Sequence, residues 1–579
     1  MKKTPVKFPY GISNFEILSR DGYIFVDKTH FIEILEAEER YSIFLRPRRF
    51  GKSLFISILE YYYDINQKHK FNEIFANYYI GKNPTPKANA YRILKFDFSG
   101  IDTQNETLSY KGFLTTLKFS LSNFMNYYQL FNKKIRNIIE NQNTPAETMK
   151  SFFKFWKEEV NDQYPIFLLI DEYDHFTNEI LIRDLKEFKR SVSQDGYIRK
   201  FYETLKIATQ QGFIDRFFIT GVSPITLDSL TSGFNIGKHL SLNPIYHDMM
   251  GFRLIEVQNL LNLTLVNNEL IPPILLDLQK WYNGYKFSVD ATESLFNPDM
   301  ILYFLDHFKN HHKYPLQMLD PNIMPDYSKI MKLFHVANYL NNIEVLEQIL
   351  ENGKISCELI YQFNFEQPFD KTAFVNLLFY LGNLTLEGLN ELLNYPNFVI
   401  PNYVIARLFW QYYALVLQNL ASFEYDTNSI HEAIVACAYG NIGKFFQFIQ
   451  ILLEGLSNRD YQKFNEKYVK AVIMSYLHHA SFYYIRSERE IGNHGYVDLE
   501  ILQHPNKKTQ AMQYAMEIKY LKQNEAHKLN LTMENAKNQL KNYLKFDKEL
   551  QNMDKLMLIA VVIVKDKIYW EEVSRNFEY

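Results

Sequence analysis

The chain has 579 residues, of which 47% are hydrophobic and 22% are charged, and its formal net charge is -3. This composition is typical of a globular protein, and at about 100–200 residues per domain the length predicts three or four structural units. The near-neutral charge excludes a basic field over the whole molecule, so binding of nucleic acid would need a local patch. Two cysteines, Cys357 and Cys437, exclude a disulfide framework and a cysteine-built zinc site, and they favour a reducing, cytoplasmic compartment.

Neither a secretion signal nor a membrane span is expected. The first fifteen residues contain lysines, but no apolar run follows them. The longest apolar run, at 556–564, is far shorter than the roughly 18 apolar residues of a membrane helix, and its β-branched residues predict a buried strand.

Strand-like runs alternate with helical stretches from residue 41 to about 245, which favours a mostly parallel α/β sheet. The pattern is helical between about 250 and 430, and a second α/β pattern begins at about 460. We therefore expect an α/β domain at 1–300, a helical connector at 301–439 and a smaller α/β domain at 440–579. The expected strands are 41–45, 92–98, 165–172 and 216–222 in the first domain and 481–488, 495–502, 511–519 and 556–564 in the last, where helices are expected at 465–480 and 524–546.

A phosphate-binding loop is predicted within the stretch IFLRPRRFGKSLF at 43–55. Gly51, Lys52 and Ser53 match the end of the pattern G-x-x-x-x-G-K-[ST], although Arg46 stands where the first glycine is usual. A strand precedes the loop and an amphipathic helix follows it, so the N–H groups at the helix start would attract phosphate. Lys52 would then contact the β- and γ-phosphates of ATP, and Ser53 would bind Mg²⁺.

Three further features bear on this site. Arg48 and Arg49 make the loop basic, so the loop alone is equally consistent with a structural turn or a simple anion site. The apolar run PIFLLIDEYD ends in Asp171 and Glu172, which suit an acid that holds Mg²⁺ through water and an acid that orients the attacking water. Thr220, at the end of another strand, suits a sensor of the γ-phosphate, with an ordinary hydroxyl-capped strand end as the alternative. Together these features favour nucleotide binding.

The first 300 residues also carry a family resemblance. The stretches PYGISNFEILSRDGYIFVDKTHFIEILE, FLRPRRFGKSLF, LKFDFSGI, LIDEYD and FITGVSPIT, and then WYNGYKF with FNPDMIL at 281–302, resemble the AAA-ATPase-like family of bacterial proteins. The resemblance implies a P-loop-type α/β ATPase domain, and it implies that Arg46 is the normal family form. Asn283 departs from the family, in which an acidic residue is common at that place, so its role in that loop stays open.

A second site is predicted near the C-terminus. Asp498 ends one strand-like run, and Glu517 and Lys519 follow on the next. Because the period of a strand is two, Glu517 and Lys519 point to one face, where Asp498 on the neighbouring strand can join them. Two carboxylates that face one point bind Mg²⁺, and the lysine can position or deprotonate the attacking water. The alternative is a pattern of alternating charges on a solvated face.

Residues around this pattern strengthen the interpretation. Glu466, on the preceding helix, could add a metal ligand or orient the lysine, and Gln539 and Tyr543 share one face of a later helix. The segment resembles the PD-(D/E)XK nuclease superfamily, which implies a restriction-endonuclease-like α/β fold. In this chain Tyr496 and Val497 follow Gly495 where an arginine often precedes the aspartate, and this removes a phosphate contact but no metal ligand.

Two functions remain open from the sequence. One is an enzyme that binds and hydrolyses ATP with Mg²⁺ and cleaves DNA or RNA through its C-terminal domain. The other is a nucleotide-switched binding or regulatory protein whose nuclease-like fold is inactive, with a bacterial effector as one form of it. Glu172 favours turnover over simple binding, and the set Asp498, Glu517 and Lys519 favours cleavage. The sequence does not name the nucleic acid, and an oligomer stays open.

Overall fold

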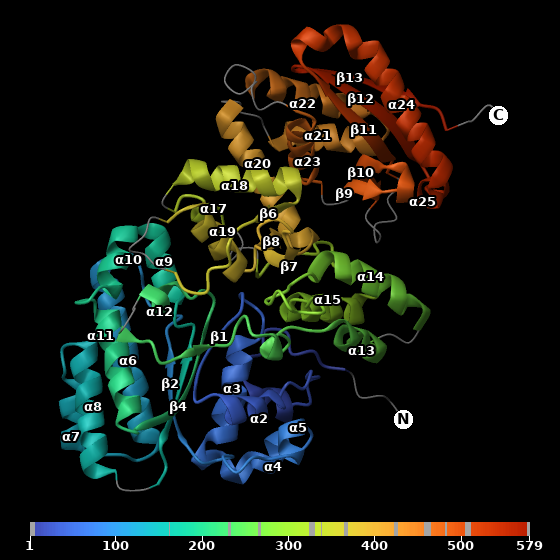
Figure 1. Ribbon diagram of the computed structural model, residues 1–579. Helices are drawn as coiled ribbons and strands as arrows, with labels where there is room; N and C mark the ends of the chain where they lie inside the picture. The colour runs from blue at the N-terminus through green and yellow to red at the C-terminus, as the bar shows by residue number, and fades with distance from the viewer. Residues whose placement is uncertain are drawn as a thin grey trace. The chain divides into compact units, whose positions relative to one another are not determined.

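The computed structural model describes residues 6–160, 163–229, 233–264, 268–323, 330–336, 338–363, 369–421, 427–456, 465–480, 483–503 and 511–575 (Figure 1). The chain forms two compact units. Unit 1 comprises Met1–Val345 and Lys354–Val404, and unit 2 comprises Leu346–Gly353 and Ile405–Tyr579. Among the described residues, no helix is both long and apolar enough to cross a membrane.

Unit 1 is built on a five-stranded parallel sheet in the order β2-β3-β4-β1-β5. Every residue of β3 is buried, as expected for a continuous apolar run in the middle of a parallel sheet. The four strands predicted for this domain are confirmed, and the short strand β5 was not predicted. The strands are β1 (Tyr41–Leu45), β2 (Arg92–Asp97), β3 (Ile166–Asp171), β4 (Ile214–Gly221) and β5 (Lys238–His239).

Helices cover both faces of this sheet, with α3 on one side and α6, α8 and α11 on the other (Figure 1). Asn105, Asn132 and Thr144 begin α6, α7 and α8, and each side chain accepts a hydrogen bond from a backbone N–H of the first turn. The α-helices of this part are α1 (Phe15–Arg20), α2 (Phe31–Glu38), α3 (Lys52–Tyr63), α4 (Phe71–Phe75), α5 (Tyr79–Lys82), α6 (Glu106–Tyr127), α7 (Lys133–Glu140), α8 (Pro145–Glu159), α9 (His175–Arg183), α10 (Leu185–Val192), α11 (Tyr197–Gln210) and α12 (Ile225–Ser229).

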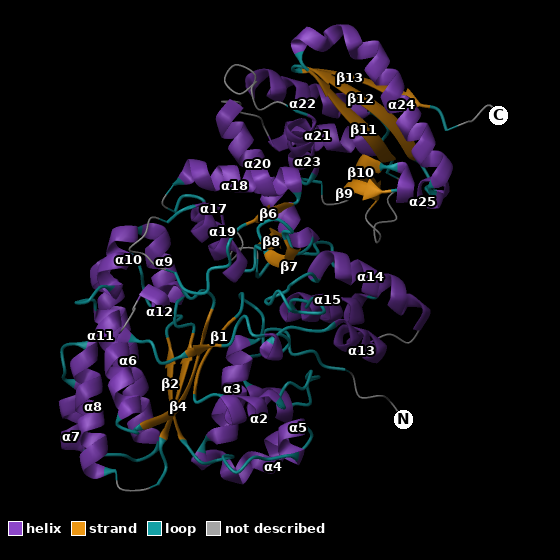
Figure 2. Cartoon of the chain, viewed as in Figure 1, coloured by secondary structure: helices purple, strands orange, loops and turns teal. Residues whose placement is uncertain are grey.

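The middle of the chain is largely helical, as predicted (Figure 2). It also holds a small antiparallel sheet in the order β6-β8-β7, which was not predicted because its strands are only three to five residues long. Its elements are α13 (Leu254–Thr264), α14 (Ile271–Tyr282), α15 (Pro298–His311), α17 (Ile330–Leu333), α18 (Tyr339–Asn352), β6 (Lys354–Ser356), α19 (Lys371–Tyr380), β7 (Thr385–Leu389) and β8 (Pro396–Val399).

Unit 2 contains a mixed sheet in the order β13-β12-β11-β10-β9, in which only β11 and β12 are parallel. α24 packs along one face of the sheet through an apolar cluster that includes Ala536, Leu540, Val562 and Ala560 (Figure 1). The elements are α20 (Tyr403–Ala421), α21 (Thr427–Ala438), α22 (Ile442–Leu456), α23 (Glu466–Leu477), β9 (Tyr483–Glu490), β10 (Tyr496–Gln503), β11 (Gln513–Leu521), α24 (Leu529–Phe546), α25 (Lys548–Asn552), β12 (Leu556–Val564) and β13 (Lys567–Val573).

The α/β fold predicted for this region is confirmed, with three differences. The start of the strand predicted at 481–488 lies outside the described residues, and that strand continues to Glu490. The helix predicted from 524 begins as a 3₁₀ turn, Gln523–Lys528, before α24. β13 was not predicted, because most of its side chains are exposed and it carries no apolar alternation.

Candidate functional site

The phosphate loop connects β1 to α3. Gly51 is the residue before α3 and has φ 95°, a left-handed conformation that glycine adopts without strain. Lys52 is the first helical residue and is only 4% exposed. Its Nζ donates to the carbonyl of Pro47 at 3.2 Å and lies 3.6 Å from Oε1 of Glu172. The lysine predicted to bind phosphate is thus held inside the site, directed away from solvent.

Arg46, which replaces the first glycine, is a buried anchor for this loop. Its guanidinium donates to the carbonyl oxygens of Leu45, Ser241, Tyr246 and His247, at distances between 2.7 and 3.1 Å. The guanidinium also lies over the rings of Phe44 and Phe287, at 4.2 and 4.1 Å from their centroids. Because Arg46 is occupied by backbone carbonyls, its position in the motif is explained by loop geometry and not by contact with phosphate.

The end of β3 delivers the two predicted acids. Asp171 is buried, and this burial raises the pKa of its carboxyl to about 6, although a hydrogen bond with Ser53 opposes the rise. The N–H of Glu172 donates to Oδ1 of Asp171 at 3.0 Å, and Glu172 adopts φ 49°, so the chain turns sharply at this point. Burial acts to raise the pKa of Glu172, but Lys52, His175 and Arg48 together hold it below its ordinary value. Glu172 is therefore an ionised carboxylate beside the loop.

Thr220 does not reach into the site. It is fully buried, and its hydroxyl donates to the carbonyl of Phe44 at 2.8 Å, which ties β4 to β1. Beyond β4, the carboxylate of Asp174 accepts hydrogen bonds from the N–H groups of Val222 and Ser223, at 2.9 and 2.7 Å. The structure thus gives Thr220 a bond within the sheet, and it makes Asp174, which has no role in the sequence analysis, the residue that shapes this strand end.

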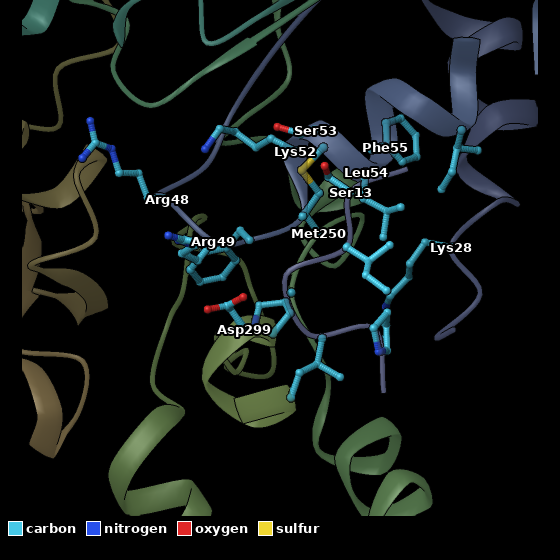
Figure 3. Close-up of a pocket in the computed structure, with 18 of the residues that line it drawn as sticks. Ser13, Lys28, Arg48, Arg49, Lys52, Ser53, Leu54, Phe55, Met250 and Asp299 are labelled. Atoms are coloured by element: carbon cyan, nitrogen blue, oxygen red, sulfur yellow. The ribbon is translucent and has the colours of Figure 1, made fainter. Parts of the chain in front are cut away.

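A cavity of about 480 Å³ opens beside the loop. Arg49 contributes to its polar wall, and Asp299, at the start of α15, lies next to this arginine (Figure 3). Burial raises the pKa of Asp299 to about 6, with Arg49 acting in the opposite direction. The polar wall also includes Arg48, Lys52, Ser53, Asp97, Asp171 and Glu172, and the apolar wall includes Ile12, Ile24, Val26, Met250, Phe252 and Leu260.

A lining of both charged and apolar residues suits a nucleotide, whose phosphates are charged and whose base has apolar faces. Asp97, from β2, is opposite Asp171 in the sheet register and adds a third acid at the same sheet edge. Sequence reasoning missed Asp97 and Asp299, although they lie in the motifs LKFDFSGI and FNPDMIL. The signal available was an acid at the end of the predicted strand 92–98 and, for Asp299, an acid directly after Asn297 and Pro298, a pattern typical of a helix start.

The second predicted site comes together in unit 2. Nζ of Lys519 lies 2.8 Å from Oε1 of Glu517, 3.7 Å from Oδ2 of Asp498 and 3.6 Å from Oε1 of Glu466. Oδ2 of Asp498 also accepts the N–H of Ile518 at 2.8 Å, which fixes the carboxylate against β11. Four side chains from α23, β10 and β11 therefore meet at one point, with the ammonium group among three carboxylates.

The electrostatics of this cluster suit a cation. Burial, and then the neighbouring Asp498, raise the pKa of Glu517 to about 7, and burial also raises the pKa of Glu466. The three acids together raise the pKa of Lys519, although burial opposes the rise. Oε2 of Glu517 is buried and accepts no hydrogen bond from the described residues, so this oxygen is open to contact with a cation.

The cluster does not have the form of a three-ligand metal cage. Among the described residues, no group of three or more His, Cys, Asp or Glu side chains is placed to hold a metal ion. Two carboxylates, Asp498 and Glu517, remain suitable for Mg²⁺, which keeps several waters and commonly takes only one or two protein carboxylates. The residues present thus fit a hydrated Mg²⁺, and Glu466 forms an ion pair with Lys519.

Gln539 and Tyr543, the two residues of α24 predicted to lie beside this site, differ in their exposure. Tyr543 is buried, and burial, Glu517 and Asp498 raise its pKa to about 12. A methyl group added at Gly495 would come within 3.3 Å of the Tyr543 ring, so this glycine allows the close approach. Gln539 is exposed and lines an open groove together with Lys519.

Glu500 is a buried acid for which the sequence predicted no role. It lies two residues beyond Asp498 on β10 and is fully buried. Arg486 and Arg489 donate to its carboxylate at distances between 2.7 and 2.9 Å. Its charge is therefore compensated by two arginines of β9, and it holds these strands in register close to the site.

The fold and the two sites define a protein with a P-loop-type ATPase-like domain followed by a restriction-endonuclease-like domain. Residues 9–231 match the family described as a predicted AAA-ATPase, and residues 464–573 match the PD-(D/E)XK nuclease superfamily. The chain thus carries an AAA-ATPase-like domain and a PD-(D/E)XK nuclease superfamily domain. The motifs at 281–302 lie beyond the matched ATPase residues.

Two similar proteins extend this comparison. A protein of Azotobacter chroococcum mcd 1, named as an uncharacterized protein in the vnfD 5' region, is 24% identical over 514 residues, which is 86% of this chain and 87% of that protein. The Walker-type ATPase of Pyrococcus abyssi, a solved structure, has a TM-score of 0.36 and 10% identity, over 70% of this chain and 99% of that chain.

Proposed function

We propose that unit 1 binds ATP with Mg²⁺ and hydrolyses it. The proposal is supported by the ion pair between Lys52 and Glu172, whose atoms lie 3.6 Å apart beside the cavity. The N–H groups at the start of α3 and the ammonium of Lys52 would hold the phosphates, and the hydroxyl of Ser53 with Asp171 would hold Mg²⁺. The bound metal would neutralise charge on the phosphates.

Glu172 would act on the attacking water in this proposal. Its carboxylate is ionised, so it can accept a proton, and arrival of phosphates would draw Lys52 from Glu172 toward the nucleotide. Arg48 and Arg49 would contact the phosphates from the loop side of the cavity. Thr220 would act only indirectly, through the position of β4.

We further propose that unit 2 cleaves phosphodiester bonds of nucleic acid with the help of a divalent metal. Asp498 and Glu517 would bind the metal, which supplies an activated water and charge neutralisation at the phosphate. Lys519 would position that water and stabilise the phosphate charge, and Glu466 would orient Lys519. The observation that carries this proposal is the convergence of three carboxylates, those of Glu466, Asp498 and Glu517, within 3.7 Å of Nζ of Lys519.

The test is a cleavage assay with full-length protein on panels of DNA and RNA, with Mg²⁺ or EDTA and with or without ATP. We expect cleavage that needs the metal, and its absence in Asp498→Asn. If ATP binds but no nucleic acid is cut under any condition, the protein is instead a nucleotide-switched binding protein with an inactive nuclease-like fold. The direct 2.8 Å ion pair between Lys519 and Glu517 is the observation that favours this second function, because it occupies an oxygen of a proposed metal ligand.

A further inference from the structure

A polar groove of about 590 Å³ begins at Lys519 and follows one side of α24. Besides the lysine, the residues that line it carry carboxamide or hydroxyl groups: Thr532, Asn535, Asn538, Gln539 and Asn542. Their spacing of three and four residues puts them on one face of the helix. None of these lining residues is acidic, so the groove leads away from the carboxylates of the proposed metal site without adding negative charge.

An aromatic pair continues the same face. Phe546 follows Asn542 by four residues and is 46% exposed. Its ring stacks on the ring of His494, with centroids 3.7 Å apart and an angle of 1° between the planes. From Thr532 to Phe546 the face extends about 21 Å along the helix axis. A row of neutral hydrogen-bonding groups thus ends at two stacked, exposed aromatic residues, with Nζ of Lys545 over the Phe546 ring at 5.5 Å from its centroid.

These groups match the chemistry of unpaired nucleobases. Each carboxamide has donors and an acceptor, as a base edge does, and asparagine and glutamine pair well with base edges. Exposed rings offer stacking platforms for single-stranded bases. A surface that binds only phosphates would carry lysine and arginine instead. Asparagine is a poor helix former, so helix stability does not explain its repeated use on this face.

We propose that this carboxamide face of α24, with the stacked rings of His494 and Phe546, binds a single-stranded stretch of nucleic acid beside the phosphate to be cleaved. The inference rests on the proposed function of unit 2, because Lys519 belongs both to the groove and to the proposed metal site. Bases would lie along α24, and the backbone would pass Lys519. The face would make binding selective for base identity and for unpaired strands.

The test uses full-length protein in a Glu517→Gln background, which prevents cleavage so that affinity is read. Binding of labelled 20-residue dA, dT and dC homopolymers, and of a matching duplex, is measured by fluorescence anisotropy at several salt concentrations. The key variant is Asn535→Ala/Asn538→Ala/Asn542→Ala, because alanine favours helix and leaves the fold intact. The matched control is Asn530→Ala, an exposed residue of the same helix that does not line the groove.

We expect the triple variant to bind single strands about 10- to 100-fold more weakly and to lose the preference among homopolymers. The dependence of affinity on salt should not change, because neutral carboxamides release no counterions. Phe546→Ala should weaken binding of all homopolymers about equally, since stacking tolerates every base. Asn530→Ala should match the parent protein.

The inference is overturned if the triple variant binds as tightly as the parent, if the duplex binds more tightly than the single strands, or if no oligonucleotide binds at all. Its failure is distinct from failure of the proposed cleavage. If protein with an intact Glu517 cuts DNA or RNA equally well with and without the three asparagines, the proposed binding face is wrong and the proposed nuclease activity stands. If the triple variant binds more weakly but the protein cuts no nucleic acid, the proposed binding face stands and the proposed nuclease activity is wrong.

Discussion

Nζ of Lys52 lies 3.6 Å from Oε1 of Glu172, although the two residues follow strands, β1 and β3, that are not neighbours in the sheet. β4 separates β1 from β3, so the loop after β1 must reach across one strand to make this pair. The lysine and the acid thus hold each other in place before any nucleotide arrives. Under the proposed function, phosphate would replace Glu172 as the partner of Lys52, and this exchange would free the carboxylate to act on the attacking water.

Lys52→Ala should weaken ATP binding by roughly 10- to 100-fold, as expected when a charge-assisted contact of about 1.5–3 kcal/mol is lost. The measurement is isothermal titration calorimetry with ATP and Mg²⁺. Lys186→Ala, which removes an exposed lysine of α10, is the matched control and should bind as the wild type does. Unchanged affinity in Lys52→Ala would show that the loop does not hold phosphates.

Glu172→Gln should retain ATP binding and lose hydrolysis by about 10²–10⁴-fold, because an amide cannot take up the proton of the attacking water. Phosphate release and calorimetry on the same variant separate the two effects. The control is Glu106→Gln, which changes an exposed acid that pairs with Arg190 on the surface. A Glu172→Gln protein that hydrolyses ATP at the normal rate assigns the base to another group.

Asp498→Asn and Lys519→Ala should differ in their effects. The first removes a carboxylate ligand, so metal affinity and cleavage should fall together. The second leaves both carboxylates, so metal binding should persist while cleavage slows by about 10²–10⁴-fold. Calorimetry with Mg²⁺ or Mn²⁺ and cleavage rates give the comparison, with the exposed Lys444→Ala as control. Equal loss of metal binding in both variants would contradict the proposed roles.

Asp299→Asn should stabilise the protein at neutral pH and have little effect in acid. Burial raises the pKa of this carboxyl from 3.8 to about 6, so the folded state binds the proton more tightly than the unfolded state. Its contribution to stability is therefore full below pH 3.8 and is lost as the pH rises through 6. The expected gain at pH 7.5 is about 1–3 kcal/mol in urea unfolding. The exposed Asp290→Asn is the control, and a gain that is equal at pH 4 and 7.5 would contradict the charge argument.

A fragment of residues 405–579 should fold by itself and be more stable than one of residues 440–579. Tyr514 donates to the carbonyl of Cys437 at 2.5 Å, and the N–H of Met512 donates to the carbonyl of Ala438 at 3.0 Å. The shorter fragment lacks both acceptors and should lose about 1–3 kcal/mol. Urea denaturation followed by circular dichroism measures the difference, and equal stabilities would show that α21 adds nothing to the strands.

The sequence predicted the sheets better than the contacts within them. Continuous apolar runs such as 166–171 and 556–564 have one stable place, the middle of a sheet, so β3 and β12 were predictable. The fixed side-chain period of β11 likewise predicted that Glu517 and Lys519 share a face, and both contact each other.

What could not be predicted depends on residues far apart in the chain. Thr220 had the right chemistry for a phosphate sensor, but its orientation follows from the pairing of β4 with β1, which brings the carbonyl of Phe44 within reach. The pairing of Glu500 with two arginines of β9 depends in the same way on strand register. The short strands β6 to β8 had no sequence signal of sufficient length.

The buried guanidinium of Arg46 has a thermodynamic consequence for ligand binding. A flexible glycine-rich loop would be ordered when the nucleotide arrives, at about 1–2 kcal/mol of conformational entropy for each residue fixed. Here the side chain of Arg46 already ties the start of the loop to four backbone carbonyls, three of them from residues 241–247, so the ordering of this residue takes place during folding. The free energy of nucleotide binding therefore does not include this entropy cost, and the loop should be equally rigid with and without ATP.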